Sequence, residues 1–93
     1  NNISDISALA SLSNLQVLHL AVNNISNISS LAGLSNLRWL ALPGNNVSDI
    51  SALVENVEFS DGDTVYLAVN PLSMESINNY IPQLQARGVI ISY

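Results

Sequence analysis

Apolar residues recur along this chain at a fixed interval, and the polar residues between them recur in the same register. Segments 1–22 and 23–44 agree at 14 of their 22 positions. The apolar slots then continue into a third segment, in the series Ile3, Ile25 and Val47, the series Ile6, Ile28 and Ile50, and the series Leu9, Leu31 and Leu53. A period of this length predicts a solenoid, in which each copy forms one coil against the next.

Each copy predicts one short strand and one tight turn. Apolar residues alternate at Leu18 and Leu20, so we expect strands near residues 15–21, 37–42, 64–68 and 88–92, joined coil by coil into a parallel sheet. The segments that read S-D-I-S-A-L are too short for full helices, and we expect turns or 3-10 helices there.

The last part of the chain predicts a helix over residues 74–87. Ser73 is placed to cap it, and an apolar face follows at i, i+3, i+4 and i+7. Pro82 lacks an N–H and predicts a kink or a break. The residues expected to cover the last coil are Ile77, Tyr80, Ile81 and Leu84.

Two copies carry the motif L-x-x-L-x-L-x-x-N-x-L, which is the signature of leucine-rich repeats. The motif positions are Leu15, Leu18, Leu20, Asn23 and Ile25, then Leu37, Leu40, Leu42, Asn45 and Val47. The 22-residue length and the turn sequence resemble the internalin-like repeats of bacterial surface proteins. The segment from Gly62 onward resembles the end piece that closes such arrays.

The resemblance implies an α/β solenoid of right-handed superhelical form, with a short parallel sheet on its concave face, 3-10 turns on its convex face and a C-terminal capping helix plus strand. We expect a single domain, 1–93, with repeats 1–22, 23–44 and 45–69 and a cap at 70–93. Because the sequence opens within a repeat, we also expect it to be the C-terminal part of a longer array, able to self-associate through an uncapped N-terminal end.

An asparagine follows each predicted strand at the framework spacing. Asn23, Asn45 and Asn70 keep this position, as does Asn1. A primary amide can donate to and accept from backbone groups that a turn leaves unpaired. We interpret these residues as a structural ladder.

Five of the eight differences between the first two copies fall in the short stretch 16–22, which covers the predicted strand and its end. Aligned outward positions give four columns: Gln16, Arg38, Asp63 and Arg87; Val17, Trp39, Thr64 and Gly88; His19, Ala41, Tyr66 and Ile90; and Ala21, Pro43, Ala68 and Ser92. Trp, Tyr and Arg gathered on one face have the composition of a binding hot spot. The candidate binding residues are Gln16, Val17, His19, Arg38, Trp39, Asp63, Tyr66 and Arg87. The alternatives are a surface charge ladder at Asp63 and a tryptophan that only shields its neighbours.

Composition limits the partners. The net charge of −5 disfavours nucleic acid and anionic membranes, and no apolar run is long enough to cross a bilayer. There is no cysteine, and a single His19 without a matched carboxylate predicts neither a catalytic triad nor a zinc site. We expect no cofactor. Oxygens of Glu58, Asp61, Gly62 and Asp63 suit a solvated loop better than a calcium site, although the sequence leaves calcium binding by the acidic loop 55–63 open.

Three classes of function remain. A module that binds a protein or peptide through the concave face is favoured, because a rigid sheet presents a surface that can vary while the framework stays. A spacer within a larger surface protein and a carbohydrate-binding adhesin segment are the alternatives, and an enzyme is not supported. The resemblance adds a bacterial protein that is secreted or held at the cell surface and acts in adhesion or recognition.

Overall fold

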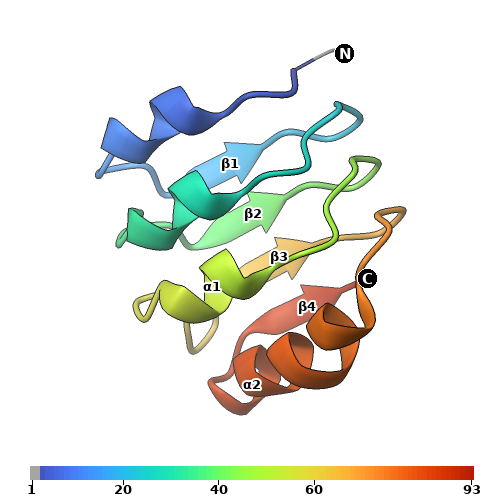
Figure 1. Cartoon of the computed structure of the whole chain (residues 1–93). Coiled ribbons are helices and arrows are strands. Elements are labelled where there is room, and N and C mark those ends of the chain that lie inside the picture. The colour runs from blue at the N-terminus through green and yellow to red at the C-terminus, as the bar shows by residue number, and fades with distance from the viewer. Residues whose placement is uncertain (1–2) are drawn as a thin grey trace.

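The computed structural model describes residues 3–93, and Asn1 of the expected ladder lies outside the described residues. The chain winds into stacked coils, each with one strand and one return segment (Figure 1). The elements are η1 (Ser7–Ser11), β1 (Val17–His19), η2 (Ser29–Gly33), β2 (Trp39–Ala41), α1 (Ser51–Glu55), β3 (Thr64–Tyr66), η3 (Ser76–Tyr80), α2 (Ile81–Ala86) and β4 (Ile90–Ser92).

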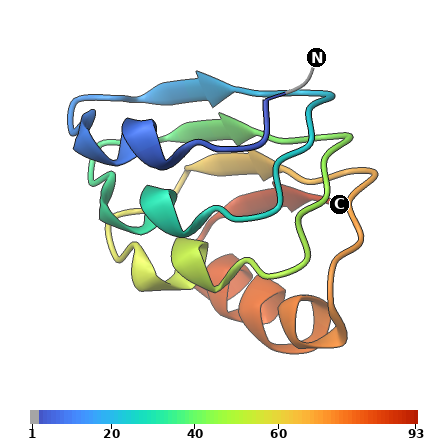
Figure 2. The same ribbon diagram turned by 45° about the horizontal axis from the view of Figure 1, so that its top comes forward.

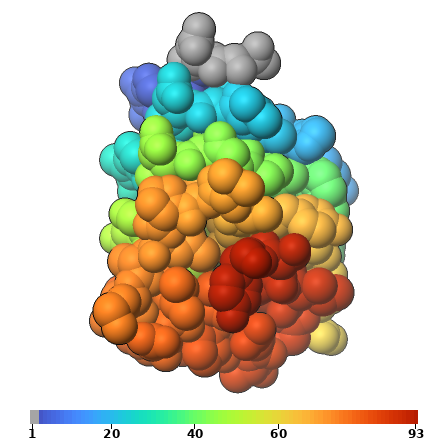
Figure 3. All heavy atoms as spheres, turned by 90° about the vertical axis from the view of Figure 1, so that its right-hand side faces the viewer, coloured from blue at the N-terminus to red at the C-terminus, as the bar shows by residue number. Residues whose placement is uncertain are grey.

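The four strands form one parallel sheet in the order β1-β2-β3-β4. All of the helical segments lie on one side of it, so the other side of the sheet is open (Figure 2). In the space-filling view the coils follow one another as bands from the N-terminal to the C-terminal end (Figure 3). The predicted solenoid with its parallel sheet and capping helix is confirmed.

The core lies between the sheet and the helical layer and is built from the recurring apolar slots. The second and third coils are the best covered, because each has a neighbour on both sides. In the first coil Ile3 and Leu12 remain 43% and 47% exposed, whereas Ile25 and Leu34, one period later, are fully buried. Burying one such side chain contributes about 1.5–3 kcal/mol, so stacking supplies most of the stability of a coil.

The convex return segments begin with a repeated side-chain turn. The Oδ1 atoms of Asp5, Asn27 and Asp49 accept the backbone N–H two residues later, at 2.9, 2.9 and 2.8 Å. Such a bond favours a tight turn over a regular helix. The predicted 3-10 helices form in the first two coils, while the third coil has the short helix α1 in the same place.

The C-terminal cap differs from the expected kinked helix. Ser73 Oγ accepts the Ser76 N–H at 3.1 Å, as predicted for a cap. The chain then forms the π-helix η3 immediately before α2, with Pro82 in the first turn of α2. A wider π turn removes the need for the i→i−4 bond that proline cannot make.

The π turn also rotates the apolar face. Ile81 and Leu84 are buried as predicted, but Ile77 is exposed and Ser76 is buried in its place. The assignment of Ile77 to the covering face is therefore wrong. Ser76 Oγ instead donates to the Ser48 carbonyl at 2.6 Å and accepts the Ile50 N–H at 3.2 Å, which ties the cap to the third coil.

Candidate binding surface

The open side of the sheet presents two outward side chains from each strand. We call this surface the sheet face and define it by Val17, His19, Trp39, Ala41, Thr64, Tyr66, Ile90 and Ser92. The register places Trp39 beside Val17 and Thr64, and Ala41 beside His19 and Tyr66. Strands bury one side chain in the core between each outward pair, so the alternation fixes the direction of every member.

Three aromatic rings form a continuous row across the sheet face. The centroids of His19 and Trp39 lie 5.6 Å apart with the planes at 62°, and those of Trp39 and Tyr66 lie 5.4 Å apart at 63°. Both contacts are diagonal, because Trp39 is aligned with Val17 and Thr64 rather than with the other two rings. Edge-to-face pairs of this geometry contribute about 0.5–1.5 kcal/mol each beyond the area they bury.

The small residue Ala41 makes the row possible. It points outward between His19 and Tyr66 in the register, and it is nevertheless only 3% exposed. The rings of its neighbours therefore cover it. A large residue at this position would occupy the space that the rings share.

Apolar and cationic residues flank the row. Val17 and Ile90 are exposed at 59% and 58%, at the two outer strands of the face. Arg38 and Gln16 are exposed immediately before β2 and β1, where the Arg38 N–H bonds to the Gln16 carbonyl at 2.8 Å. The row thus has an apolar residue on either side and an arginine where the strands begin.

Asp63 and Arg87 do not project from this surface. The predicted column is correct as far as Asp63, which aligns with Arg38 one position before the pair Trp39 and Thr64. Its last member is wrong, because the register places Val89 rather than Arg87 beside Asp63. Asp63 is buried, and its Oδ2 accepts the Ser60 N–H at 2.9 Å within a tight turn. Arg87 ends α2, and its guanidinium donates to the carbonyls of Asn56, Phe59 and Val54. The Asp63 carboxylate is used inside its own turn, and the Arg87 guanidinium links the cap to the third coil.

The fourth strand is shifted by two residues from the predicted alignment. Ile90 is paired with Thr64 and Ser92 with Tyr66, so Gly88 lies before the strand rather than on the face. Gly88 has φ of +95°, and a Cβ there would lie 2.5 Å from Asp61 Oδ1. The turn into β4 therefore needs a glycine, and the strand begins only after it.

The asparagines after the strands bond on the inner side of the sheet. Asn45 Nδ2 donates to the carbonyls of Leu20 and Leu42 at 2.9 and 3.0 Å, and its Oδ1 accepts the Ile25 N–H at 3.1 Å. Asn23 and Asn70 make the corresponding bonds. Their Oδ1 atoms accept the Ile3 N–H and the Val47 N–H, and their Nδ2 atoms donate to carbonyls of their own coils. Each amide links the backbones of adjacent coils or of one coil to the return segment before it.

A further buried amide was missed by sequence reasoning. Asn56 stands where the first two copies have Leu12 and Leu34, and it is 2% exposed. Its Nδ2 donates to the Leu31 and Leu34 carbonyls at 3.0 Å each, on the neighbouring coil. The substitution of an amide for a framework leucine was the available signal. Phe59 fills the core three residues later.

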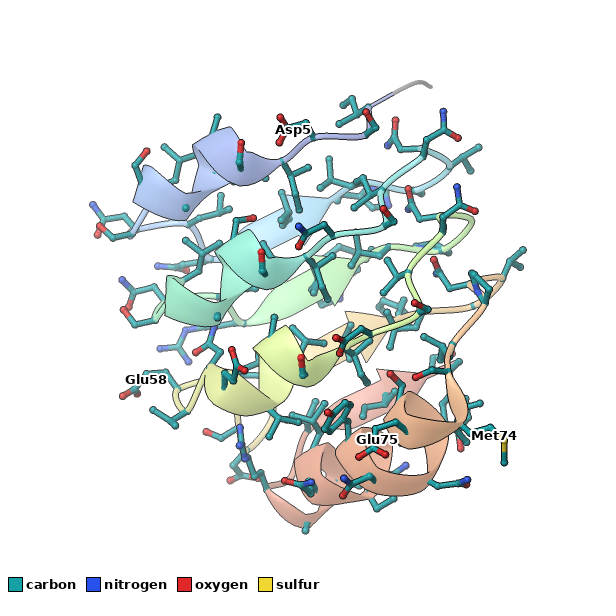
Figure 4. The ribbon with its side chains drawn as sticks, viewed as in Figure 1. Asp5, Glu58, Met74 and Glu75 are labelled. Carbon is teal, nitrogen blue, oxygen red and sulfur yellow. The ribbon has the colours of Figure 1, made fainter. Side chains whose placement is uncertain are left out.

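The carboxylates lie away from the sheet face. Asp5, Glu58 and Glu75 mark three such places: the first convex turn, the loop before β3 and the terminal helix (Figure 4). Backbone and side-chain hydrogen bonds from Ser7 lower the pKa of Asp5, and bonds from Ser51 lower the pKa of Asp49. In the stretch 3–93 no three His, Asp or Glu residues come together to hold a metal ion.

Comparison with known proteins agrees with the repeat. A family model described as leucine rich repeat matches residues 1–47. The crystal structure of internalin C2 from Listeria monocytogenes str. 4b F2365 is 37% identical over 98% of this chain, with a TM-score of 0.72. The match covers 40% of the internalin C2 chain, so this chain spans well under half of that protein. No curated protein matches the chain.

Among residues 3–93, no helix is both long and apolar enough to cross a membrane. The recurring framework leucines, the parallel sheet and the internal asparagines, together with the matching family model, lead to one assignment. The chain belongs to the leucine rich repeat family, and its repeats are internalin-like.

Proposed function

We propose that the sheet face is the recognition surface of a protein-binding or peptide-binding module. The observation that carries the proposal is the continuous row His19–Trp39–Tyr66. Large rings that are held by one another lose little conformational entropy when a partner covers them. The row is placed on short strands of a packed sheet, which keeps its geometry fixed before binding.

The exposure of these groups also supports recognition rather than shielding. Trp39 is half-buried, and Tyr66 and Val17 are 38% and 59% exposed. Framework positions beneath the same strands, such as Leu18 and Leu40, are buried. A tryptophan that served only to cover Ala41 would not need a histidine and a tyrosine packed against both of its sides.

The likeness to internalin C2 supports a bacterial protein that is secreted or held at the cell surface. A spacer is the competing function, and it requires that the sheet face tolerate any substitution that keeps the fold. A carbohydrate-binding surface would use the same rings, but through stacking on sugar rather than on peptide groups. The proposal therefore depends on which class of molecule binds to Trp39.

The test begins with peptides selected from a random linear library against the immobilised domain, because such a selection does not depend on the identity of the partner. Replacement Trp39→Ala should weaken the selected peptides by about 2 kcal/mol or more, roughly 30-fold, since it removes the centre of the row. The free energy of unfolding should fall by about 1–3 kcal/mol, because both edge-to-face contacts of the indole are lost, while the leucine core beneath keeps the domain folded. Isothermal titration and thermal unfolding measure the two effects.

The matched control is Ser29→Arg, at an exposed position of the convex layer. This variant should bind the selected peptides as the parent does. Peptides that bind Trp39→Ala as tightly as the parent, or that fail only with Ser29→Arg, would place the site on the other side of the solenoid.

A further inference from the structure

We propose that the partner of the sheet face is an acidic segment of protein, with an Asp or Glu carboxylate against Arg38. This inference rests on the proposed function and specifies the chemistry of its ligand. The residues that carry it are Arg38, Trp39 and Tyr66, together with the position of every carboxylate in the described part of the chain.

The first step is the separation of charge. The chain has seven acidic residues and two arginines, so a random surface patch would be acidic. Within residues 3–93, however, no carboxylate projects from the sheet face. The acids lie in the convex turns, in the loop before β3 and in the terminal helix: Asp5, Asp49, Glu55, Glu58, Asp61, Asp63 and Glu75.

The carboxylates that come nearest in sequence to β3 are already committed elsewhere. Asp63 lies beside Arg38 in the register of β2 and β3, but it is 6% exposed and its Oδ2 accepts the Ser60 N–H within its own turn. Asp61 lies against Gly88, in the loops that precede β3 and β4, whereas Arg38 immediately precedes β2. An acidic partner therefore meets no fixed carboxylate on the face itself.

The second step is the hydrogen bonding of the two arginine side chains. Arg87 has its guanidinium bonded to three backbone carbonyls of the third coil, at the end of α1 and in the loop after it. Arg38 is exposed, and its guanidinium makes no hydrogen bond or ion pair with another residue of the part that the structure describes. Because a guanidinium offers five N–H donors in a planar fork, it matches a carboxylate with two parallel bonds.

The polar atoms of Trp39 and Tyr66 also favour a partner that carries hydrogen-bond acceptors. The indole of Trp39 is a donor only, and the hydroxyl of Tyr66 can donate, so both complement an acceptor. With Arg38 immediately before β2, Trp39 next to it and Tyr66 on the adjacent strand, the donors follow a diagonal path across the sheet. A segment that carries acceptors along its length can use all three.

The overall charge of −5 does not oppose this contact strongly. Charges in water are screened over about 8 Å at physiological ionic strength. The molecule extends 33 × 29 × 16 Å, so acids in the convex layer and at the C-terminal end act weakly on a group bound to the sheet face. Asp63, the acid aligned with Arg38, is buried and bonded within its own turn, so the exposed charge at this place is that of Arg38.

The experiment compares two selections from one random dodecapeptide library displayed on phage, one against the parent domain and one against Arg38→Glu. Asp and Glu should be enriched about 2-fold or more over the unselected library with the parent, and Lys and Arg should replace them with Arg38→Glu. Ser29→Arg adds a positive charge on the convex side and should leave the acidic enrichment unchanged.

A synthetic acidic peptide from the first selection then gives the pairwise effect. Arg38→Ala should weaken it by about 5-fold to 10-fold, and Asp→Asn in the peptide should do the same. The two changes together should cost no more than one alone, because they remove the same pair. The loss should also shrink at high salt.

The outcomes separate this inference from the proposed function. If the selected peptides depend on Trp39 but show no acidic enrichment and no response to Arg38→Glu, the acidic partner is wrong and the sheet face remains the site. If peptide binding is indifferent to Trp39→Ala, the proposed function fails and the acidic partner fails with it.

Discussion

Two rows of side chains cross the same strands on opposite sides. Inside, Asn23, Asn45 and Asn70 occupy one framework position in successive coils. Outside, the row His19–Trp39–Tyr66 runs diagonally, and no two of its members are alike. The inner row repeats its chemistry because each amide meets the same backbone carbonyls in every coil, whereas the outer row meets only its neighbours and solvent.

The difference indicates where this fold tolerates change. A position is held constant when the backbone of the next coil supplies its partners, as the Leu20 and Leu42 carbonyls do for Asn45. A position can vary in sequence when its only partners are other side chains. Residues on the outer side can then change without disturbing the hydrogen bonds that join the coils.

The largest expected effect comes from breaking the inner row at its centre. Asn45→Ala leaves the Ile25 N–H and at least two carbonyls without their partner in a buried site, at a cost of about 2–3 kcal/mol. Asn46→Ala is the matched control, because Asn46 is exposed and its backbone bond to Ile25 survives. Urea unfolding of the two variants measures the effect, and equal midpoints would contradict the role of Asn45.

A second, smaller effect tests whether Asn56, like Asn45, stabilises the fold through hydrogen bonds to the backbone of a neighbouring coil. Asn56→Leu restores the residue that the first two copies have, but it removes the bonds to the Leu31 and Leu34 carbonyls. The added apolar contact offsets part of this loss, so we expect destabilisation of about 1–2 kcal/mol. An unchanged or higher free energy of unfolding would show that the leucine is the better framework residue here.

Much of the fold follows from the sequence because two copies can be compared position by position. The strands, their parallel order and the convex turns all derive from slots that recur, and alternation within the strands places Val17, His19, Trp39 and Tyr66 on one face. Their role in binding remains a prediction. The asparagine bonds are seen in the geometry, while their contribution to stability awaits measurement.

The wrong predictions fall in the parts of the chain that have no second copy in the sequence, namely the third coil and the cap. The third coil carries three extra residues before β3, and the cap contains a π turn that alters the helical period. Neither feature has a second copy from which its register can be calibrated, so the sequence pattern aligns Arg87 with Arg38 and assigns Ile77 to the buried face. Asn56 is a visible exception to the leucine pattern, but its burial depends on carbonyls of the neighbouring coil that the sequence does not place.

The smallest expected effect concerns the turn that follows each strand and leads into the next convex return segment. Val22 and Val69 have φ of 57° and 58°, at the position that Gly44 fills in the second coil with φ of 71°. A left-handed conformation costs an L-residue about 1–2 kcal/mol, and most for a β-branched one, whereas glycine adopts it freely. Val69 is 84% exposed, so removing its side chain loses almost no packing.

Val69→Gly should therefore stabilise the protein, although the greater entropy of glycine in the unfolded chain cancels part of the gain. We expect a net increase of about 0.5–1 kcal/mol in the free energy of unfolding, measured by urea titration. Val69→Ala is the matched control, because alanine loses the same exposed side chain but still meets the left-handed penalty, and it should gain less than glycine does. Equal stability of both variants would show that backbone strain at this turn is negligible.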